Sequence, residues 1–298
     1  MEGKTVALLT PTYNRAHLLP RLYESLSAQT DKGFTWYIVN DGSTDNTEQL
    51  CEAFALEEIK IVYIKKENGG KHTAINTAMQ VIDEPLTFIV DSDDYLSADA
   101  VETIIKDYER YHGNQNIAGM SYYRAHFDGV IIGDAFLSDY FESNYLTYII
   151  NRQIKGDKAE VFKTEILKQM PFPVHGNERF CSEAVVWMEI AKRYDFIYRT
   201  KAIYFCEYLS DGLTKQGGRR VVENPLAYID HANAMMSEGV RFLIRCKYMI
   251  MYVASSKIAG KQKESYKQVR EKWMYHLFYP LGILYYYYLN RKWGIKRV

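Results

Sequence analysis

The sequence predicts an α/β fold built on a mostly parallel sheet with flanking helices, followed by a helical C-terminal extension. Three observations predict it. Short apolar runs alternate with helical stretches over the first hundred residues, a polar cluster follows each run, and the pattern turns helical from about Asn224 onward. With 298 residues, 47% of them hydrophobic and 25% charged, the chain has a globular composition, which excludes a disordered or collagen-like protein.

Four apolar runs are expected to form buried strands, with three helices between them. The strands are predicted at 6–10, 36–40, 59–64 and 86–90, and the helices at 16–28, 44–56 and 71–81. Strands joined by helices in this order form parallel sheets with right-handed crossovers. Because ligands bind such sheets beyond the carboxyl ends of the strands, functional residues are expected just after each strand.

The pattern changes after the fourth strand. Residues 118–136 are expected to form antiparallel strands joined by a hairpin turn at Asp128 and Gly129. A mixed region follows. We therefore divide the chain into residues 1–225, with a subdivision near residue 100, and a helical region at 226–298.

Cysteine usage and the absence of targeting patterns indicate a reducing compartment. The four cysteines are far apart and form no CxxC pair: Cys51, Cys181, Cys206 and Cys246. The apolar run near Met1 is too short for a secretory signal, and no stretch approaches the ~20 apolar residues of a spanning helix. We expect a cytoplasmic protein.

The zero net charge hides two opposed regions. From Val240 to the end there are 13 Lys or Arg and two acidic residues, a net charge of +11, which leaves −11 on residues 1–239. Nine Trp, Tyr or Phe side chains fall between Trp273 and Trp293. Basic, aromatic helices are typical of peripheral contact with anionic membranes. A helical cap with a solvated basic face is the alternative, and no motif supports nucleic acid.

Polar clusters follow the predicted strands. Asp91, Ser92, Asp93 and Asp94 come directly after the fourth strand, and carboxylates this close together repel one another unless a cation such as Mg²⁺ or Mn²⁺ is present. A solvated acidic turn is the alternative. Lys71 follows two glycines at a helix N-terminus, where phosphate binds readily.

Two further side chains are candidates for binding a nucleoside. Asp41 would accept hydrogen bonds from a base N–H or a ribose hydroxyl, or would simply form an Asx turn. Tyr13 would stack on a base or contribute to packing. The chain has no GxGxxG after the first strand, which argues against a nicotinamide or flavin enzyme.

The segments 10–15, 40–45, 68–76 and 91–94 together resemble the nucleotide-sugar-binding half of family 2 glycosyltransferases, which have the GT-A fold. Asn40 stands where the family often has a second Asp. The resemblance implies a nucleotide-binding half at 1–100 and an acceptor half at 101–225. It implies a metal site at Asp91 and Asp93 for Mn²⁺ or Mg²⁺, with Asp93 and Asp94 at the reacting sugar. The implied nucleotide-sugar-binding residues are Pro11, Thr12, Tyr13, Asn14, Arg15, Asp41, Lys71, Asp91, Ser92 and Asp93.

An inverting transfer also needs a base to take the acceptor proton. Glu183 is the candidate, since it opens a predicted helix where relatives often carry an acid pair, and Glu178 is the reserve. The alternative for Glu183 is favourable placement at the helix N-terminus. Trp187 would stack on an acceptor sugar or belong to the core. Lys215, Arg219 and Arg220 would reach the diphosphate from a glycine-flanked loop, or form a solvated basic loop.

The resemblance implies a metal-dependent, inverting glycosyltransferase. It would move a sugar from a nucleotide-diphosphate donor, most often a UDP-sugar, to a lipid-linked or polysaccharide acceptor. The work of relatives implies bacterial surface polysaccharide synthesis at the inner face of the cell membrane. The rival hypotheses are a non-catalytic nucleotide- or sugar-binding protein and a nucleotidyltransferase.

Overall fold

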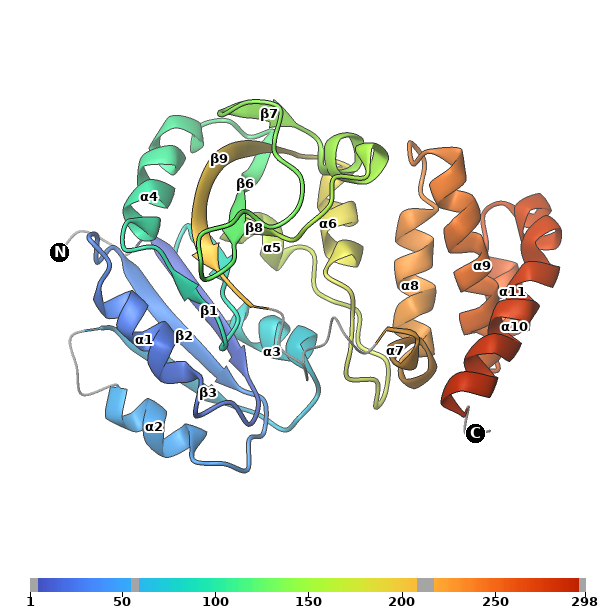
Figure 1. The fold of residues 1–298 in the computed structure, drawn as a ribbon, viewed down its shortest axis with the longest axis horizontal. Coiled ribbons are helices and arrows are strands. Elements are labelled where there is room, and N and C mark those ends of the chain that lie inside the picture. The colour runs from blue at the N-terminus through green and yellow to red at the C-terminus, as the bar shows by residue number, and fades with distance from the viewer. Residues whose placement is uncertain (1–4, 55–58, 208–216, 295–298) are drawn as a thin grey trace.

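One nine-stranded sheet organises the molecule, and a group of helices stands beside it (Figure 1). This computed structural model describes residues 5–54, 59–207 and 217–294. The strand order is β3-β2-β1-β4-β8-β6-β9-β5, with β7 paired to β9. The sheet is mostly parallel in its first half and mixed in its second, as the sequence predicts in outline.

The first half consists of the alternating elements that the apolar runs predict. They are β1 (Val6–Thr12), α1 (Leu19–Ser27), β2 (Phe34–Asn40), α2 (Thr47–Phe54), β3 (Ile61–Lys65), α3 (Lys71–Ala78) and β4 (Leu86–Ile89). Their strands pair in parallel in the order β3-β2-β1-β4. All seven predicted elements are confirmed, with ends that differ by a few residues.

The second half of the sheet joins the first through the pairing of β8 with β4. Its elements are β5 (Tyr95–Leu96), α4 (Ala100–Tyr111), β6 (Ile117–Ala125), β7 (Phe141–Ser143), the π-helix η1 (Leu146–Ile150), β8 (Lys158–Lys163), α5 (Thr164–Lys168), α6 (Ala184–Ala191) and β9 (Asp195–Phe205). β8 runs antiparallel to both β4 and β6, whereas β6 and β9 are parallel.

Of the two antiparallel strands predicted over 118–136, the first is confirmed and the second is not. β6 is there, and Gly129, with a φ of +87°, makes a turn after it, but the return leg is reduced to a single bridge between Ala125 and Ile131. The chain then bonds to another loop, because the Asp134 amide donates to the Lys155 carbonyl at 3.0 Å. That contact replaces the second strand of the hairpin.

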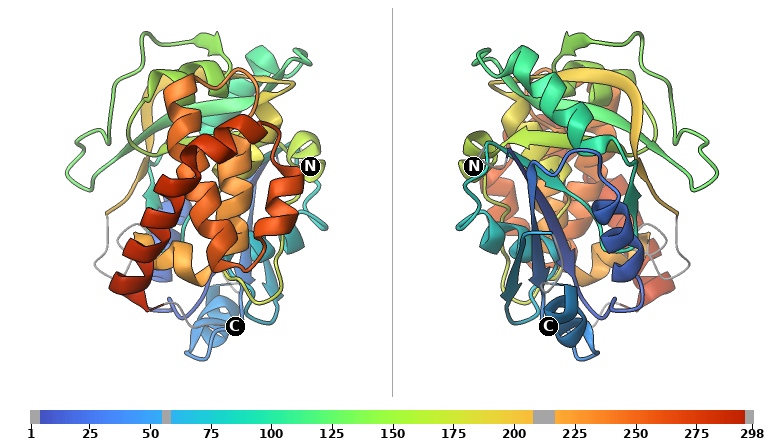
Figure 2. Two further views of the ribbon diagram at one scale, coloured as in Figure 1. Left: turned by 90° about the vertical axis from the view of Figure 1, so that its right-hand side faces the viewer. Right: turned by 90° about the vertical axis from the view of Figure 1, so that its left-hand side faces the viewer.

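Both faces of the sheet are buried, which is why the early strands are continuous apolar runs. Val6 and Leu8 of β1 face one core, with α1, α2 and α4, while Ala7 and Leu9 face a second core with α3, α5 and α6. The right half of Figure 2 shows the strands with α1 and α2 on the near side. The sheet is therefore rigid where its strand ends carry polar side chains.

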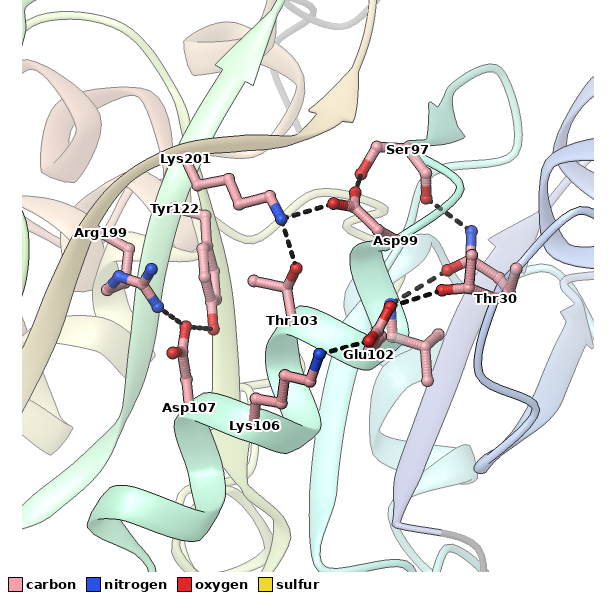
Figure 3. Close-up of polar contacts among 12 residues, drawn as sticks. Thr30, Ser97, Asp99, Glu102, Thr103, Lys106, Asp107, Tyr122, Arg199 and Lys201 are labelled. Atoms are coloured by element: carbon pink, nitrogen blue, oxygen red, sulfur yellow. Dashed lines mark hydrogen bonds and ion pairs between the residues drawn. The ribbon is translucent and has the colours of Figure 1, made fainter.

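A polar cluster, buried at Arg199 and Asp107 and partly exposed at Lys201 and Asp99, ties α4 to β9 (Figure 3). Arg199 of β9 pairs with Asp107 of α4, and the Tyr122 hydroxyl donates to the same carboxylate at 2.9 Å. Lys201 donates to Asp99 at 2.5 Å and to Thr103 at 2.7 Å. These contacts fix β9, whose far end enters the site described below.

The C-terminal region is helical, as predicted, and it packs around its own apolar cluster. The helices are α7 (Gly218–Glu223), α8 (Pro225–Met235), α9 (Phe242–Ile258), α10 (Gln262–Gln268) and α11 (Lys272–Trp293). They lie side by side in front of the sheet in the left half of Figure 2. Within the described ranges, no helix combines the length and apolar character that crossing a membrane requires.

Candidate active site

A cavity of about 1120 Å³ opens at the carboxyl ends of β1, β2 and β4, where the sequence places the functional residues. Strands β6 and β8, the N-terminal ends of α3 and α6, and helices α8 and α9 complete its walls. Its charged lining residues include Arg15, Asp41, Lys71, Asp91, Asp93, Asp94, Arg124, Glu160, Glu183, Arg220 and Lys247. The site therefore lies between the sheet and the helical region.

The loop after β1 enters the cavity with only some of its predicted residues. Pro11, Tyr13 and Arg15 line it, and Tyr13 is 44% exposed, so its ring is available to a ligand. Thr12 is buried instead. Asn14 is a tether: its Oδ1 accepts from the Thr44 amide at 2.8 Å, which joins the β1 and β2 loops.

Asp41 is almost completely buried and organises the loop before α3. Its Oδ1 accepts from Lys66 Nζ at 2.6 Å and from the Gly69 amide at 3.0 Å, and its Oδ2 accepts from the Gly70 amide at 2.7 Å. Asn40 makes the local turn, since its side chain accepts from the Ser43 amide at 2.8 Å. The side-chain turn expected for this segment therefore forms at Asn40, whereas the partners of Asp41 lie 25 to 29 residues away.

Gly70 is required where it stands. It has a φ of +93°, and a Cβ there would lie 2.1 Å from the Arg179 carbonyl oxygen. The start of α3 thus touches the segment that leads into α6. That close approach brings Lys71, the first residue of α3, next to Glu183, the residue before α6.

Lys71 bridges two carboxylates that are far apart in the sequence. Its Nζ lies 2.5 Å from Asp91 Oδ1 and 2.8 Å from Glu183 Oε1. Burial opposes protonation, but the two carboxylates raise the pKa of Lys71 above its usual range. The bridge therefore holds the acidic turn after β4 against the candidate base.

Tyr204, near the end of β9, makes hydrogen bonds to the acidic turn that follows β4. Its buried hydroxyl accepts from the Asp91 amide at 2.9 Å and donates to Asp94 Oδ2 at 2.6 Å. The Arg124 guanidinium lies 4.1 Å from the centre of the Tyr204 ring and 3.8 Å from Asp91 Oδ2. One phenol thus fixes both ends of the turn.

The carboxylates of the turn differ in their electrostatics. Burial opposes ionisation of Asp91, but Lys71 and Arg124 lower its pKa below the usual value. Burial and the Asp91 charge raise the pKa of Asp93, and they raise the pKa of Asp94 to about 8. Among the three carboxylates of the turn, Asp91 is therefore the one whose ionised form is favoured.

Asp91 and Asp93 fit a hard divalent cation that shares its coordination with substrate phosphates. Both offer carboxylate oxygens, the ligand type that Mg²⁺ and Mn²⁺ prefer, and both line the cavity. Over the described residues, no group of three or more His, Cys, Asp or Glu side chains could hold a metal ion by itself. The residues present suit an ion that arrives with a phosphate ligand.

The structure separates the two base candidates. Glu183 lines the cavity, whereas Glu178 caps helix α8 by accepting from the Leu226 and Ala227 amides at 2.9 and 2.8 Å. The reserve role for Glu178 is therefore disfavoured, because both of its oxygens are occupied. Trp187 borders the cavity, but it is only 6% exposed and packs against Phe162, with ring centroids 4.4 Å apart, which favours the core alternative.

Of the three predicted basic residues, the described part of the chain brings Arg220 to the cavity and leaves Arg219 outside it. Lys215 lies outside the described residues. Arg219 is exposed and pairs with Glu223 at 2.7 Å one turn along α7, so it does not line the cavity. Its neighbour Arg220 does, with its guanidinium 4.7 Å from the centre of the Phe180 ring.

The residues that the motif analysis missed include Arg124 and Glu160, which line the cavity, and Tyr204, which is buried behind the acidic turn. Arg124 carries a weak signal, since it is the only charged residue of β6, and Glu160 carries a weaker one, since β8 also has a lysine at each end. Tyr204 carries none, because an aromatic residue in a strand is ordinary core composition. Only the pairing of β9 with β5 and β6 brings it to the acidic turn.

The family is decided by a match to a family model. The model described as Glycosyl transferase family 2 matches residues 7–168, more than half of the chain. The chain belongs to glycosyl transferase family 2. It is therefore a transferase enzyme of a family that uses nucleotide sugars, and the resemblance stated from the four sequence segments is confirmed.

Curated relatives of this family 2 chain come from several bacteria. It is 27% identical over 219 residues to glycosyltransferase GlyA of Streptococcus pneumoniae, covering 67% of this chain and 30% of that protein. It is 25% identical over 280 residues to the GalNAc(5)-diNAcBac-PP-undecaprenol beta-1,3-glucosyltransferase of Campylobacter jejuni, covering 88% and 86%. The chain spans less than a third of the first relative and most of the second.

Solved structures confirm the GT-A fold of this family 2 chain. TarS 1–349 of S. aureus in complex with UDP-GlcNAc aligns with a TM-score of 0.66 at 16% identity, covering 97% of this chain and 91% of TarS. The mannosyltransferase PcManGT of Pyrobaculum calidifontis, in complex with GDP-Man and Mn²⁺, aligns at 0.59 and 15% identity, covering 98% and 84%. At these identities the likeness establishes the fold alone.

Proposed function

We propose that this chain is a metal-dependent, inverting glycosyltransferase that moves a sugar from a UDP-linked donor to a hydroxyl of a lipid-linked or polysaccharide acceptor. The observation that carries the proposal is the Lys71 bridge between Asp91 and Glu183. It joins the carboxylate suited to the donor's metal–diphosphate group to the carboxylate suited to deprotonate an acceptor. Both reacting partners then meet at one point of the cavity.

The residues have separate roles in this reaction. Pro11, Tyr13 and Arg15 form the wall against which the nucleoside binds. Asp91 and Asp93 would hold Mn²⁺ or Mg²⁺, which would supply positive charge against the charge that develops on the leaving diphosphate. Glu183 accepts the proton of the acceptor hydroxyl. The oxygen of that hydroxyl bonds to the anomeric carbon of the donor sugar as the bond between this carbon and the diphosphate breaks. Lys71 keeps Glu183 oriented.

The choice of substrates draws on similar proteins. TarS, solved with UDP-GlcNAc, supports a UDP-linked donor, and the mannosyltransferase solved with Mn²⁺ supports a divalent metal. The Campylobacter relative is named for an undecaprenol-linked substrate, which supports a lipid-linked acceptor in surface polysaccharide synthesis. In this proposal residues 1–100 bind the donor, 101–225 complete the acceptor side, and 226–298 form the helical extension.

The proposal also includes peripheral contact with the inner face of the cell membrane through α11. One stripe of this helix is apolar and solvent-exposed, with side chains 47% to 64% exposed: Trp273, Leu277, Leu281, Leu284 and Tyr288. The spacing of three or four residues puts them on one face. The +11 charge of residues 240–298 favours an anionic bilayer over a neutral one.

Titration of the protein with UDP tests the donor site. UDP should bind in the presence of Mn²⁺ or Mg²⁺ and should bind at least tenfold more weakly to Asp93→Ala or in EDTA. Asp83→Ala is the matched control, since Asp83 is exposed and precedes β4 instead of following it. Metal-independent binding that Asp93→Ala leaves unchanged would reject the site.

Transfer is tested separately from binding. Glu183→Gln should keep UDP affinity within about twofold and lose hydrolysis of the best donor from a panel of UDP-sugars, whereas Glu189→Gln, exposed on the same helix, should keep both. Turnover at the wild-type rate in Glu183→Gln would remove it as the base. UDP binding with no turnover by the wild type would favour the binding-protein alternative, and pyrophosphate release would favour a nucleotidyltransferase.

The membrane contact is tested by sedimentation with vesicles that contain phosphatidylglycerol. The double variant Leu277→Ser, Leu284→Ser should leave the pellet, whereas Leu137→Ser, an equally exposed leucine of the sheet region, should remain in it. An unchanged pellet for the double variant would reject α11 as the contact.

A further inference from the structure

Lys71 places a positive charge on a carboxylate to which the proposed function assigns the metal. Its Nζ, which belongs to the first residue of α3, lies 2.5 Å from Asp91 Oδ1. The side chains of Lys71 and Asp91 are 29% and 28% exposed and both line the cavity, so an ion that enters the cavity can reach this pair. Such an ion meets Asp91 with an ammonium already in contact with it.

The second oxygen of Asp91 also faces a basic side chain. The Arg124 guanidinium lies 3.8 Å from Asp91 Oδ2, and it lies over the Tyr204 ring at 4.1 Å from the ring centre. Each oxygen of Asp91 therefore has a basic nitrogen within 4 Å. Because like charges repel, a carboxylate between two cations binds a third cation more weakly than an unpaired carboxylate does.

A second carboxylate holds the ammonium of Lys71 in this position. Glu183 Oε1 lies 2.8 Å from the same nitrogen, so Lys71 stands between two carboxylates from different parts of the chain. The backbone at this point is also closely packed, since a Cβ at Gly70 would lie 2.1 Å from the Arg179 carbonyl oxygen. An ammonium with two carboxylate partners on packed backbone is displaced less easily than the ammonium of an isolated surface pair.

The acidic turn has few other oxygens to offer a free ion. Asp94 borders the cavity but is only 4% exposed, and its Oδ2 already accepts from the Tyr204 hydroxyl at 2.6 Å. Asp91 and Asp93 are then the accessible carboxylates, and Asp91 is the one paired with Lys71. Sites for Mg²⁺ commonly combine one or two carboxylates with substrate phosphates. The described residues therefore suit a metal–phosphate group and offer too few ligands for an ion alone.

A diphosphate changes this balance. It brings negative charge that Lys71 and a divalent ion can both contact, and its oxygens add to the ligands of the ion. The ammonium and the ion then share the phosphate oxygens in place of competing for Asp91. Nucleotide and ion are therefore expected to strengthen each other's binding, and by thermodynamic linkage the two factors are equal.

We propose that Lys71 makes metal binding depend on UDP. Without UDP the ammonium neutralises Asp91, so free Mn²⁺ binds weakly, and the ion and the nucleotide bind together. The inference rests on the proposed function, in which Asp91 and Asp93 hold the ion beside the diphosphate. It gives Lys71 a second role besides the orientation of Glu183.

The test measures Mn²⁺ binding by electron paramagnetic resonance of the free ion, which needs no turnover. The wild type should bind Mn²⁺ at least tenfold more weakly without UDP than with it. Lys71→Met keeps a long side chain and removes its charge, so it should bind Mn²⁺ without UDP at least tenfold more tightly than the wild type does. UDP should also strengthen Mn²⁺ binding less in this variant than in the wild type.

Two control variants separate charge from other effects. Lys71→Arg keeps the positive charge and should bind free Mn²⁺ as weakly as the wild type, within about twofold. Lys65→Met removes a lysine that pairs with Glu48 at 2.6 Å outside the cavity wall, and it should match the wild type with and without UDP.

Three results would overturn the role of Lys71. The first is a wild type that binds Mn²⁺ as tightly without UDP as with it, which decides the question without any variant. The second is a Lys71→Met variant with no gain in affinity for free Mn²⁺, and the third is an equal gain in Lys71→Arg. A wild type that fails to bind Mn²⁺ even with UDP would instead reject the metal–diphosphate site of the proposed function.

Discussion

Replacing Tyr204 by Phe should weaken UDP binding, although Tyr204 does not itself need to touch the nucleotide. The substitution removes one buried oxygen, and with it the acceptor for the Asp91 amide at 2.9 Å and the donor to Asp94 at 2.6 Å. The ring stays, so its contact with Arg124 and its edge contact with Phe88 are retained. The change is therefore confined to the support of the acidic turn.

The magnitude follows from the two hydrogen bonds. A neutral hydrogen bond contributes about 1 kcal/mol and one to a charged group about 1.5–3 kcal/mol, and Tyr204 is fully buried, so water does not replace its hydroxyl. We expect a loss of about 2 kcal/mol in the free energy of unfolding. If the same energy holds Asp91 in its binding position, UDP affinity falls by up to ~30-fold.

Tyr122→Phe is the control for a loss of stability alone. Tyr122 is also fully buried and donates to a carboxylate, that of Asp107, at 2.9 Å in the cluster of Figure 3. Denaturant unfolding and calorimetric titration with UDP and Mn²⁺ should show that both variants are destabilised and that only Tyr204→Phe binds UDP more weakly. Equal UDP affinities in the two variants would refute the positioning role of Tyr204.

Three further predictions concern stability. Both ring nitrogens of His231 are buried and have no hydrogen-bond partner among the described residues, and burial lowers the pKa of His231 to about 4. Below the unfolded value of about 6.5 only the unfolded chain gains this proton, so His231 should contribute a fall of about 2 kcal/mol in the free energy of unfolding between pH 7.5 and pH 5. That contribution is measured as the difference in pH dependence between the wild type and His231→Phe, and His17→Gln should show no such difference. Gly282→Ala should lower stability by about 1–3 kcal/mol because its Cβ would meet a valine of α9 at 2.4 Å, whereas Gly113→Ala, with open space, should be neutral in the same melts. Arg199→Met should lower the free energy of unfolding by about 3–5 kcal/mol, because the buried carboxylate of Asp107 loses its cation. A loss below about 1 kcal/mol in urea denaturation would show that the hydroxyls of Tyr122 and Tyr140 are enough to stabilise this carboxylate.

The first half of the fold was predictable because its information is local. A strand buried on both faces must be apolar throughout, and the helices between such strands have their own periodicity, so 6–90 could be assigned element by element. The second strand of the hairpin predicted over 118–136 is missing for a non-local reason, although β6 and the turn at Gly129 are confirmed. The segment after Gly129 bonds to the Lys155 carbonyl, and no pattern within the segment records that partner.

The candidate site divides in the same way. Asp91, Asp93 and Lys71 were predictable from their places after strands. The role of Asp41 was not, because its carboxylate is bonded to a lysine and to two glycine amides in a later loop. Sequence proximity also misled at Arg219, which faces solvent while its neighbour lines the cavity. Helical position, and not spacing from a motif, decides which of the two reaches the site.

By itself the sequence determined which residue types stand at the strand ends, and hence the family, and it determined the opposed charges of the two regions. The tertiary structure decided which of these residues meet. Lys71 joins Asp91 to Glu183 only because Gly70 lets the start of α3 touch Arg179, and Tyr204 reaches the acidic turn only because β9 pairs with β5 and β6. Such contacts depend on how distant strands and helices pack, and that packing is a property of the whole chain.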